Sequence, residues 1–397
     1  MKKLLFMVND LHAGGSEKAL ISLLKELVSE ELEITVMVLR KQGEFLSDVP
    51  VQVRVVEVDM PEELREEFLY GTGVLLKNAL KNRNIYEICR LLREYLGRRG
   101  MNVEQIMKKK WQQCDRKILQ NQEQYDVAID FQGQGAFSTY YVAKKIQALT
   151  KYSWIHNDYA IVTEKMEWIR SLYGCYKKIC SVSEQAKKSF ILKFPDMRDK
   201  ACICYNVMRK EEILELAKEF LIEKEIGVNI VTVGRLSTQK GYDVALKVME
   251  RLNNEKIDFH YWIIGEGEER KKLEQMVETK KLENRVCFAG FQKNPYPYIA
   301  MCDIYLQPSR FEGFCLTVGE AKILKKNIIT TDFAGASEQI QDGVNGIVTS
   351  CDEELIYKSL KMMIEDRNLR QRINKNLQCE QQIQKGLTQF KELIYLK

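Results

Sequence analysis

The chain has 397 residues, of which 45% are hydrophobic, and a formal net charge of +5 at pH 7. This length is too great for one ordinary core, so we expect two domains, and the apolar content excludes a disordered chain. The mild positive charge does not indicate nucleic acid, and no nucleic-acid partner is expected. No run of about 18 apolar residues is present, so the sequence predicts no transmembrane helix.

The cysteines and the start of the chain bear on the compartment. Eleven Cys follow no spacing typical of zinc sites or disulfide frameworks, which predicts free thiols in a reducing cytoplasm. Met1-Lys2-Lys3 followed by Leu4 to Val8 mimics a signal peptide, but five apolar residues are too few for its apolar region. A cytoplasmic location is therefore expected.

The first half alternates predicted strands and helices. Residues 3–8 form the first predicted strand, and a polar turn with Gly14 and Gly15 leads to a helix over 17–30, which we expect Ser16 to cap. Two glycines below a helix N-terminus are typical of a dinucleotide-binding opening, although the third glycine of G-x-G-x-x-G is absent. Further strands are predicted at 33–39, 51–58, 126–131, 152–156, 178–182 and 201–205.

Residues 60–124 interrupt this alternation with two or three predicted amphipathic helices. From 71 to 118 the chain has twelve Lys/Arg against four Asp/Glu, interleaved with apolar and aromatic residues. One interpretation is a solvated helical face over ordinary core. The other is a basic patch on an anionic membrane surface or a lipid phosphate, which would make the protein peripheral on the inner face of the plasma membrane.

A second alternation begins at residue 228, after a charged connection over 208–227 that we expect to be helical. Its strands are predicted near 229–233, 258–264, 285–289, 303–307, 327–330 and 346–349. The fold class is thus α/β, with two doubly wound Rossmann-like domains, 1–207 and 228–375, facing across a cleft. A last helical segment, 376–397, can pack back on the first domain.

The segment 308–323 concentrates groups suited to a phosphorylated sugar. It joins a buried strand to a helix, so Gly313 lies at the carboxyl edge of the sheet, where free backbone N–H groups favour phosphate. Glu312 and Glu320 flank this turn and can accept hydrogen bonds from hydroxyls. The structural alternatives are a solvated Glu312 and a capping box, T-V-G-E at 317–320, in which Glu320 only satisfies the helix N-terminus.

Arg235 and Lys240 follow the first strand of the second domain, five residues apart in a loop. Two fixed cations there can hold a diphosphate, Arg as a planar fork and Lys as a point charge. Because the chain has no D-x-D motif, these cations and a helix N-terminus would replace a metal. Gly265 lies in another strand-to-turn segment, a candidate wall of the nucleotide site. The alternatives are solvated surface cations and an ordinary turn.

These motifs resemble a known family. G-R-L-x3-K-G at 234–241, I-G-x-G at 264–267 and E-x7-E at 312–320 are similar to the donor-binding half of the GT-B glycosyltransferases of family 4, the retaining glycosyl transferases group 1. A-G-x-x-E at 334–338 and D-G-x-N-G at 342–346 continue the match, and G-G-x-E at 14–17 resembles the family's first loop. The insertion at 60–124 lies outside the family pattern.

The resemblance implies roles for the donor-site residues. Arg235 and Lys240 would clamp the nucleotide diphosphate, and Gly15 would approach it. Glu320 would accept hydrogen bonds from the ribose hydroxyls, and Glu312 from hydroxyls of the transferred sugar. The backbone N–H groups that bind the sugar and the phosphate would be those of Gly313, Phe314, Cys315 and Leu316.

Toward the acceptor, the resemblance places His156 at the sugar or its anomeric carbon, with Gly14 and Asp158 as neighbours. The alternative for His156 is a packed structural histidine. Phe314-Cys315 departs from the common family pattern, which leaves the donor sugar open.

The resemblance also implies a reaction: retaining transfer of a hexose by front-face attack, with the leaving phosphate taking the acceptor's proton and no metal or further cofactor. We expect a nucleotide-sugar donor, UDP-linked, and a lipid-linked or polysaccharide acceptor in surface glycan synthesis. Two other functions stay open: a nucleotide-sugar 2-epimerase, which needs no acceptor, and a catalytically silent nucleotide-sugar-binding protein.

Overall fold

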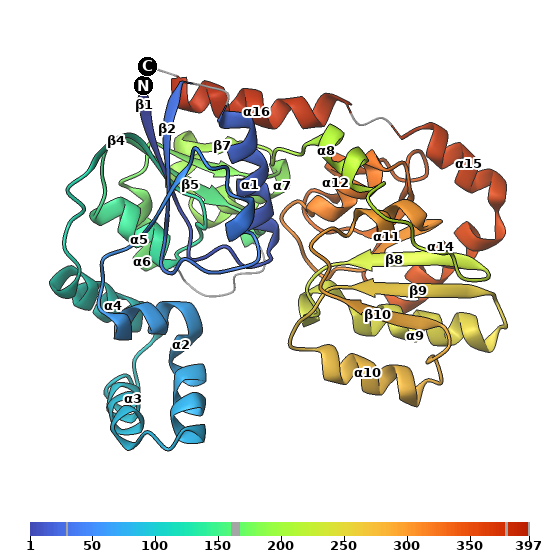
Figure 1. Ribbon diagram of the computed structural model, residues 1–397, viewed down its shortest axis with the longest axis horizontal. Helices are drawn as coiled ribbons and strands as arrows, with labels where there is room; N and C mark the ends of the chain where they lie inside the picture. The colour runs from blue at the N-terminus through green and yellow to red at the C-terminus, as the bar shows by residue number, and fades with distance from the viewer. Residues whose placement is uncertain (29–30, 160–166, 378–379, 396–397) are drawn as a thin grey trace. The chain divides into compact units, whose positions relative to one another are not determined.

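The computed structural model describes residues 1–28, 31–159, 167–377 and 380–395 (Figure 1). Contacts within the chain separate two compact units. The first consists of Met1–His156, Val162–Cys180 and Ile191–Cys202. The second consists of Asn157–Ile161, Ser181–Phe190 and Ile203–Lys397.

The first sheet has seven strands in the order β3-β2-β1-β4-β5-β6-β7. β1 pairs in parallel with both β2 and β4, so the strand order reverses at β1, as in a doubly wound sheet. From Leu4 to Met7 the side chains of β1 are apolar and buried, as expected for a parallel strand that is covered on both faces. The strands are β1 Lys2–Met7, β2 Leu32–Val38, β3 Arg54–Glu57, β4 Gln124–Asp130, β5 Gln147–Ile155, β6 Lys178–Ser181 and β7 Ala201–Ile203.

The helix after β1 begins earlier than the sequence predicts. α1 spans Gly15–Leu27, and the extended Gly14 is its N-cap without any side-chain cap bond. The Ser16 hydroxyl donates instead to Glu17 Oε2, at 2.9 Å. The expectation that Ser16 caps this helix is therefore wrong, because the chain already turns helical one residue before it. Between β4 and β7 the chain also forms α5 Phe137–Lys144, α6 Glu167–Tyr173 and α7 Glu184–Lys193.

The insertion between β3 and β4 contains three helices, which confirms the helical prediction for it. They are α2 Glu62–Lys81, bent at Gly71, α3 Ile85–Gly97 and α4 Val103–Lys117. Trp111 of α4 stacks on Tyr140 of α5, with ring centroids 4.6 Å apart, which attaches the insertion to this unit. Figure 1 shows α3 beside the second half of α2 and away from the sheet.

The second sheet has six strands in the order β10-β9-β8-β11-β12-β13. β8 pairs in parallel with β9 and β11, so this order also reverses, at β8. Each of the six predicted strands of this half is present near its expected position. They are β8 Val228–Val233, β9 Phe259–Ile264, β10 Val286–Gly290, β11 Ile304–Gln307, β12 Asn327–Thr331 and β13 Ile347–Thr349.

Helices pack on both faces of this sheet around an apolar core that includes Ile230, Leu246 and Ile304. The helices from the connection onward are α8 Lys210–Leu216, α9 Tyr242–Asn254, α10 Arg270–Thr279, α11 Tyr296–Met301, α12 Leu316–Ile323, α13 Ala336–Gln339, α14 Glu353–Glu365, α15 Arg367–Lys375 and α16 Glu380–Tyr395. α16 contacts the segment after β7, where Gln389 Oε1 accepts a hydrogen bond from Tyr205 N at 3.1 Å.

The connection at 208–227 is helical only over α8. The prediction of a helix throughout is wrong because Leu221 and Ile226 are exposed, so the second part has no apolar face to bury. The cysteines in the described ranges are free thiols, as expected. Within the same ranges, no helix is both long and apolar enough to cross a bilayer.

Candidate functional site

The loop after β8 brings Lys240 to the carboxyl edge of the second sheet. A short 3-10 turn, Thr238–Lys240, ends at Gly241, whose φ of 68° favours glycine. A Cβ at Gly241 would lie 2.0 Å from the Pro308 carbonyl oxygen. Only glycine therefore lets this loop touch the segment that follows β11.

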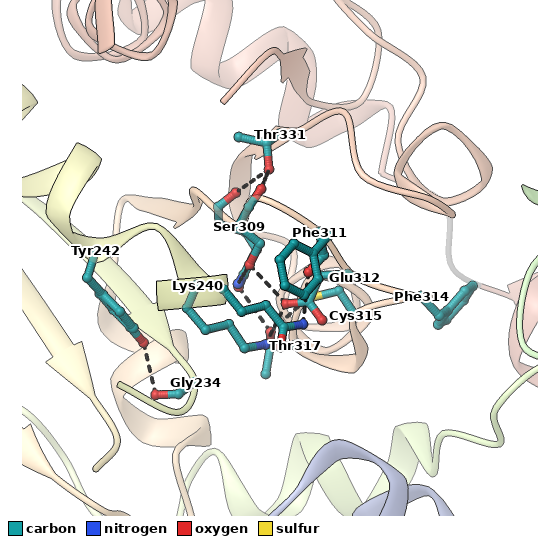
Figure 2. A network of polar contacts seen from close by, with 12 residues as sticks. Gly234, Lys240, Tyr242, Ser309, Phe311, Glu312, Phe314, Cys315, Thr317 and Thr331 are labelled. Atoms are coloured by element: carbon teal, nitrogen blue, oxygen red, sulfur yellow. Dashed lines mark hydrogen bonds and ion pairs between the residues drawn. The ribbon is translucent and has the colours of Figure 1, made fainter. Parts of the chain in front are cut away.

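Lys240 and Glu312 form an ion pair where these two loops meet (Figure 2). The Lys240 Nζ lies 2.5 Å from Glu312 Oε1, and the side chains are only 17% and 10% exposed. Burial lowers the pKa of Lys240, but the adjacent Glu312 carboxylate more than offsets this, so the net pKa lies above the ordinary lysine value. Lys240 is therefore a fixed positive charge at neutral pH.

A series of hydrogen bonds between buried polar side chains ends at the Glu312 carboxylate. Tyr305 OH donates to Gln307 Oε1 at 2.8 Å, and Gln307 Nε2 donates to Ser309 Oγ at 2.8 Å. Ser309 Oγ in turn donates to Glu312 Oε1 at 2.9 Å. Gln307 and Ser309 are fully buried, so these bonds hold the carboxylate in one orientation. We call this series the β11 polar chain.

The β11 polar chain is a feature that the sequence motifs did not predict. Its available signal was the pair Gln307 and Ser309, two polar residues at alternate positions at the end of a strand that is otherwise apolar and buried. Buried polar groups need partners, so such a pair predicts a hydrogen-bonded network.

A second set of contacts, which the sequence motifs also did not predict, fixes the loop that contains Lys240. Arg310 makes a bidentate ion pair with Asp243 of α9, with N–O distances of 2.8 and 2.7 Å. Arg310 Nη1 also donates to the Thr238 carbonyl oxygen at 2.7 Å. Because these contacts tie the β8–α9 loop to the segment after β11, they limit movement of Lys240 relative to Glu312.

The turn after Glu312 has an unusual backbone at Cys315. This residue is the N-cap of α12, with φ 65° and ψ 89°, a left-handed conformation that L side chains rarely adopt. Its Sγ lies 3.3 Å from Thr317 Oγ1, and burial raises the pKa of the thiol to about 12. The neighbouring Phe314 points away from the Lys240–Glu312 pair in Figure 2 and packs near Tyr205.

Glu320 is almost completely buried on α12, which begins at Leu316. The capping-box interpretation of Glu320 is excluded because the N-cap is Cys315 and Glu320 is the fifth helical residue, two residues beyond the N3 position that the box requires. Gly313 lies between Glu312 and the helix, and Leu316 is the first helical residue.

Two further residues of the predicted donor site lie next to the β8 loop. The Arg235 side chain is exposed and, within the described ranges, makes no ion pair. Gly265, after β9, has a φ of 147°, and a Cβ there would lie 2.0 Å from the Gly234 carbonyl oxygen. The β8 and β9 loops therefore touch through their backbones, directly beside Arg235.

The remaining predicted site residues are elsewhere in the chain. His156 follows β5 in the first unit, where its Nε2 lies 2.7 Å from the Phe131 carbonyl oxygen. Because a carbonyl only accepts, Nε2 carries the proton and Nδ1 is an acceptor. Burial lowers the pKa of His156 to about 4, so the ring is neutral at physiological pH.

Gly14 and Gly15 form the N-terminus of α1 in the same unit. A Cβ at Gly15 would meet no atom within 4 Å, so packing within the protein does not require glycine there. Asp158 is half-buried in the segment Asn157–Ile161, which groups with the second unit. Among the described residues, no group of three or more His, Cys, Asp or Glu side chains is arranged to hold a metal ion.

The sequence was compared with protein families and curated relatives. Residues 216–378 match the family described as Glycosyl transferases group 1. The N-acetylgalactosamine-N,N'-diacetylbacillosaminyl-diphospho-undecaprenol 4-alpha-N-acetylgalactosaminyltransferase of Campylobacter jejuni subsp. jejuni serotype O:2 is 31% identical over 204 residues, or 51% of this chain and 54% of the relative. LpsE of Rhizobium meliloti, a lipopolysaccharide core biosynthesis glycosyltransferase, is 26% identical over 145 residues. These are 36% of this chain and 42% of LpsE. The chain spans about half the length of the curated relatives it matches.

Solved structures share the fold over the full length. Anabaena HepE in complex with UDP and glucose has a TM-score of 0.70 at 18% identity, covering 100% of both chains. WaaG, a glycosyltransferase involved in lipopolysaccharide biosynthesis, has a TM-score of 0.63 at 14% identity, covering 99% of this chain and 100% of that one. The fold is therefore that of the GT-B glycosyltransferases. Residues 216–378 match the glycosyl transferases group 1, the broader family that the motifs resemble.

Proposed function

We propose that this protein is a glycosyltransferase of family 4 that transfers a hexose from a UDP-linked sugar to a lipid-linked or polysaccharide acceptor. Transfer would retain the anomeric configuration and need no metal ion. The observation that carries the proposal is the buried Lys240–Glu312 pair at the carboxyl edge of the second sheet. Sheets of this kind bind ligands at that edge, next to the point where the strand order reverses.

Lys240 would bind the donor's diphosphate. Its ammonium group has three N–H donors, and the pairing with Glu312 uses one of them. The raised pKa keeps the group charged, and the exposed guanidinium of Arg235 adds a second cation on the same loop. Two fixed cations would stabilise the charge that develops on the leaving diphosphate.

Glu312 would bind the hexose. Its Oε1 accepts from both Lys240 and Ser309, whereas Oε2 makes no hydrogen bond with the described part of the chain. Oε2 can thus accept hydrogen bonds from sugar hydroxyls, while the β11 polar chain holds the carboxylate in place. Glu320 would take the ribose hydroxyls, as the family resemblance implies.

The chemical step would follow from this arrangement. The acceptor hydroxyl attacks the anomeric carbon on the face that the diphosphate leaves, so the C–O bond to phosphate breaks as the new glycosidic bond forms. The proton of the attacking hydroxyl passes to the leaving phosphate oxygen, and the products are UDP and the glycoside. Neutral His156 would contribute its Nδ1 as a hydrogen-bond acceptor for a sugar hydroxyl.

The names of the relatives support the choice of substrates. The Campylobacter jejuni relative is named for a diphospho-undecaprenol acceptor, and HepE was solved with UDP and glucose. A lipid-linked acceptor would place this protein on the cytoplasmic side of an anionic membrane.

A direct assay tests the proposal. Purified protein is incubated in excess EDTA with UDP-, GDP- or ADP-linked hexoses and an undecaprenyl-diphosphate-linked sugar, and NMR defines the product's anomeric configuration. We expect UDP release and a glycosylated lipid of retained configuration only when the acceptor is present. Loss of activity in EDTA would contradict metal independence, and an inverted product would contradict retention. Release of a free epimerised sugar without acceptor would indicate the epimerase instead.

A further inference from the structure

Helix α3 of the insertion carries an apolar stripe that the described part of the chain leaves exposed. The stripe consists of Ile85, Cys89, Leu92 and Leu96, spaced by four, three and four residues, which places them on one side of a helix. Ile85 is 74% exposed, Leu92 41% and Leu96 59%, and Cys89 is also exposed. Surface helices normally turn such a stripe toward a core.

Another side of α3 already packs against α2. Leu91 of α3 is buried against Leu75 and Ala79 of α2, in a small core that the two helices share. This core uses a different side of α3 from the stripe, since Leu91 lies about 100° from Leu92 on the helix. The stripe is therefore an additional apolar face, and the fold of the α2–α3 pair does not require it.

The charges around the stripe are not balanced. The two acids of α3, Glu87 and Glu94, both pair with Arg90, and Glu94 also lies 3.7 Å from Arg98. These contacts neutralise the carboxylates on the side of α3 away from the stripe. Five exposed cations of the α2–α3 pair and its flanks make no ion pair with the described residues: Lys77, Lys81, Arg83, Arg93 and Arg99.

We propose that the α3 stripe inserts into the headgroup region of an anionic lipid membrane. Arg93 lies beside the stripe on the helix surface, Arg99 follows its end, and exposed Tyr86 flanks it. Apolar side chains bordered by cations and tyrosine fit the boundary between acyl chains and anionic headgroups. This surface narrows the basic segment 71–118 to one helix, α3.

A second copy of the chain fits the stripe less well than a membrane. α3 has 13 residues, fewer than the three to four heptads that identify a coiled coil. Pairing two stripes would also bring Arg93 and Arg99 of each copy close to the same cations of the other. An anionic lipid surface instead attracts these charges.

The inference rests on the proposed function, since a lipid-linked acceptor requires the enzyme to work at a membrane. Its test does not depend on catalysis. The full-length protein is floated with vesicles of equal parts phosphatidylglycerol and phosphatidylethanolamine, and separately with phosphatidylcholine vesicles. We expect binding to the anionic vesicles only, weakened at high salt because the lipid charges are screened.

The decisive variant is Leu92→Ser/Leu96→Ser, matched by Leu192→Ser/Leu221→Ser, which changes two exposed leucines outside the insertion. We expect the first to bind anionic vesicles at least about tenfold more weakly and the second to bind as the unaltered protein does. Arg93→Glu/Arg99→Glu tests the cations and should produce a loss of similar size. Thermal unfolding of each variant verifies that it is folded.

A fluorescent variant reports membrane insertion directly, so the test does not depend only on variants that lose vesicle binding. Tyr86→Trp places an indole beside the stripe, and its fluorescence should shift to shorter wavelength when anionic vesicles are added. Equal vesicle binding by Leu92→Ser/Leu96→Ser and the unaltered protein would overturn the inference. So would a dimer in solution that this variant converts to monomer. Transfer to a short-chain, water-soluble acceptor should persist in the variant, which separates failure of membrane binding from failure of the transferase.

Discussion

Lys240 and Glu312 are 72 residues apart in the chain, yet their side chains form a 2.5 Å ion pair that is mostly buried. Each partner is held from its own side, Lys240 by the close approach of Gly241 to Pro308 and Glu312 by Ser309. A buried pair fixed in this way costs desolvation energy, and a substrate site is a physical reason to retain it.

Replacing Lys240 with Ala should affect both activity and stability. Turnover should fall by roughly 10²–10³-fold, the scale for losing one group that stabilises developing charge. Because Glu312 would stay mostly buried without its partner, the free energy of unfolding should fall by about 3 kcal/mol. Steady-state kinetics and urea unfolding measure the two effects.

The matched control is Lys247→Ala, which removes a half-exposed lysine whose ion pair with Glu353 spans 3.9 Å. Its cost should lie within the range of exposed pairs, about 0–1 kcal/mol, with unchanged turnover. Normal turnover by Lys240→Ala would remove this lysine from the donor site.

Gly241→Ala should damage the site through the backbone. The new Cβ would overlap the Pro308 carbonyl oxygen, so the Lys240 loop must move away from the segment after β11. Gly343→Ala is an apt control because its φ of 70° matches the 68° of Gly241, while a Cβ there meets nothing within 4 Å.

We expect Gly343→Ala to cost about 1–2 kcal/mol for the left-handed backbone alone, and Gly241→Ala to cost more. Only Gly241→Ala should weaken UDP binding, as measured by isothermal titration. Equal costs for the two variants, with unchanged UDP affinity, would show that the contact with Pro308 does not position Lys240.

Substitutions at Cys315 should reveal the strain at the start of α12. Glycine relieves the positive φ, so Cys315→Gly should change the unfolding free energy by no more than about 1 kcal/mol, since the lost side-chain contacts and added chain entropy oppose the relief. Cys315→Val should be less stable than Cys315→Gly by about 1–3 kcal/mol, because a β-branched residue tolerates this backbone poorly.

The same pair of variants probes the donor sugar. The Cys315 thiol lies beside Thr317 and near the Lys240–Glu312 pair, so Cys315→Gly should alter the ratio of kcat/KM values between two UDP-hexoses. A Cys315→Val variant more stable than Cys315→Gly would contradict backbone strain at this turn. An unchanged ratio of kcat/KM values would contradict a role of Cys315 in the choice of donor sugar.

His156 should make stability depend on acidity. Burial lowers its pKa from 6.5 to about 4, so between these values the unfolded chain binds a proton that the folded protein does not. Stability from this group is therefore complete above pH 6.5 and is lost as the pH falls to 4, on the order of 3 kcal/mol in total.

Urea unfolding across this range measures the effect, with His156→Gln as the comparator. The unaltered protein should lose more stability than the variant as the pH falls. Parallel pH profiles for the two proteins would show that His156 titrates normally and is not held neutral by burial.

Much of the fold follows from short-range patterns. Apolar strands that alternate with amphipathic helices predict both sheets, because parallel strands buried on two faces need apolar residues throughout. The same rule places Lys240, Glu312 and Gly265 after strand ends, so their shared edge is predictable from sequence.

Other features depend on partners that sequence spacing does not reveal. The β11 polar chain links Tyr305, Gln307, Ser309 and Glu312 through side-chain hydrogen bonds. Cys315 adopts a left-handed backbone conformation for which glycine is the expected residue. Because a cysteine stands there, the sequence does not predict this turn. Ser16 fits the composition rule for an N-cap, but Gly14 takes that position, because local preference alone does not decide where a helix starts.

The most direct measurement on the donor site is a crystal structure of the protein with UDP, grown in the presence of EDTA. The proposed chemistry predicts the diphosphate within hydrogen-bonding distance of Lys240 Nζ and the Arg235 guanidinium, with the ribose hydroxyls at Glu320. A diphosphate bound elsewhere, with the Lys240–Glu312 pair untouched, would contradict it.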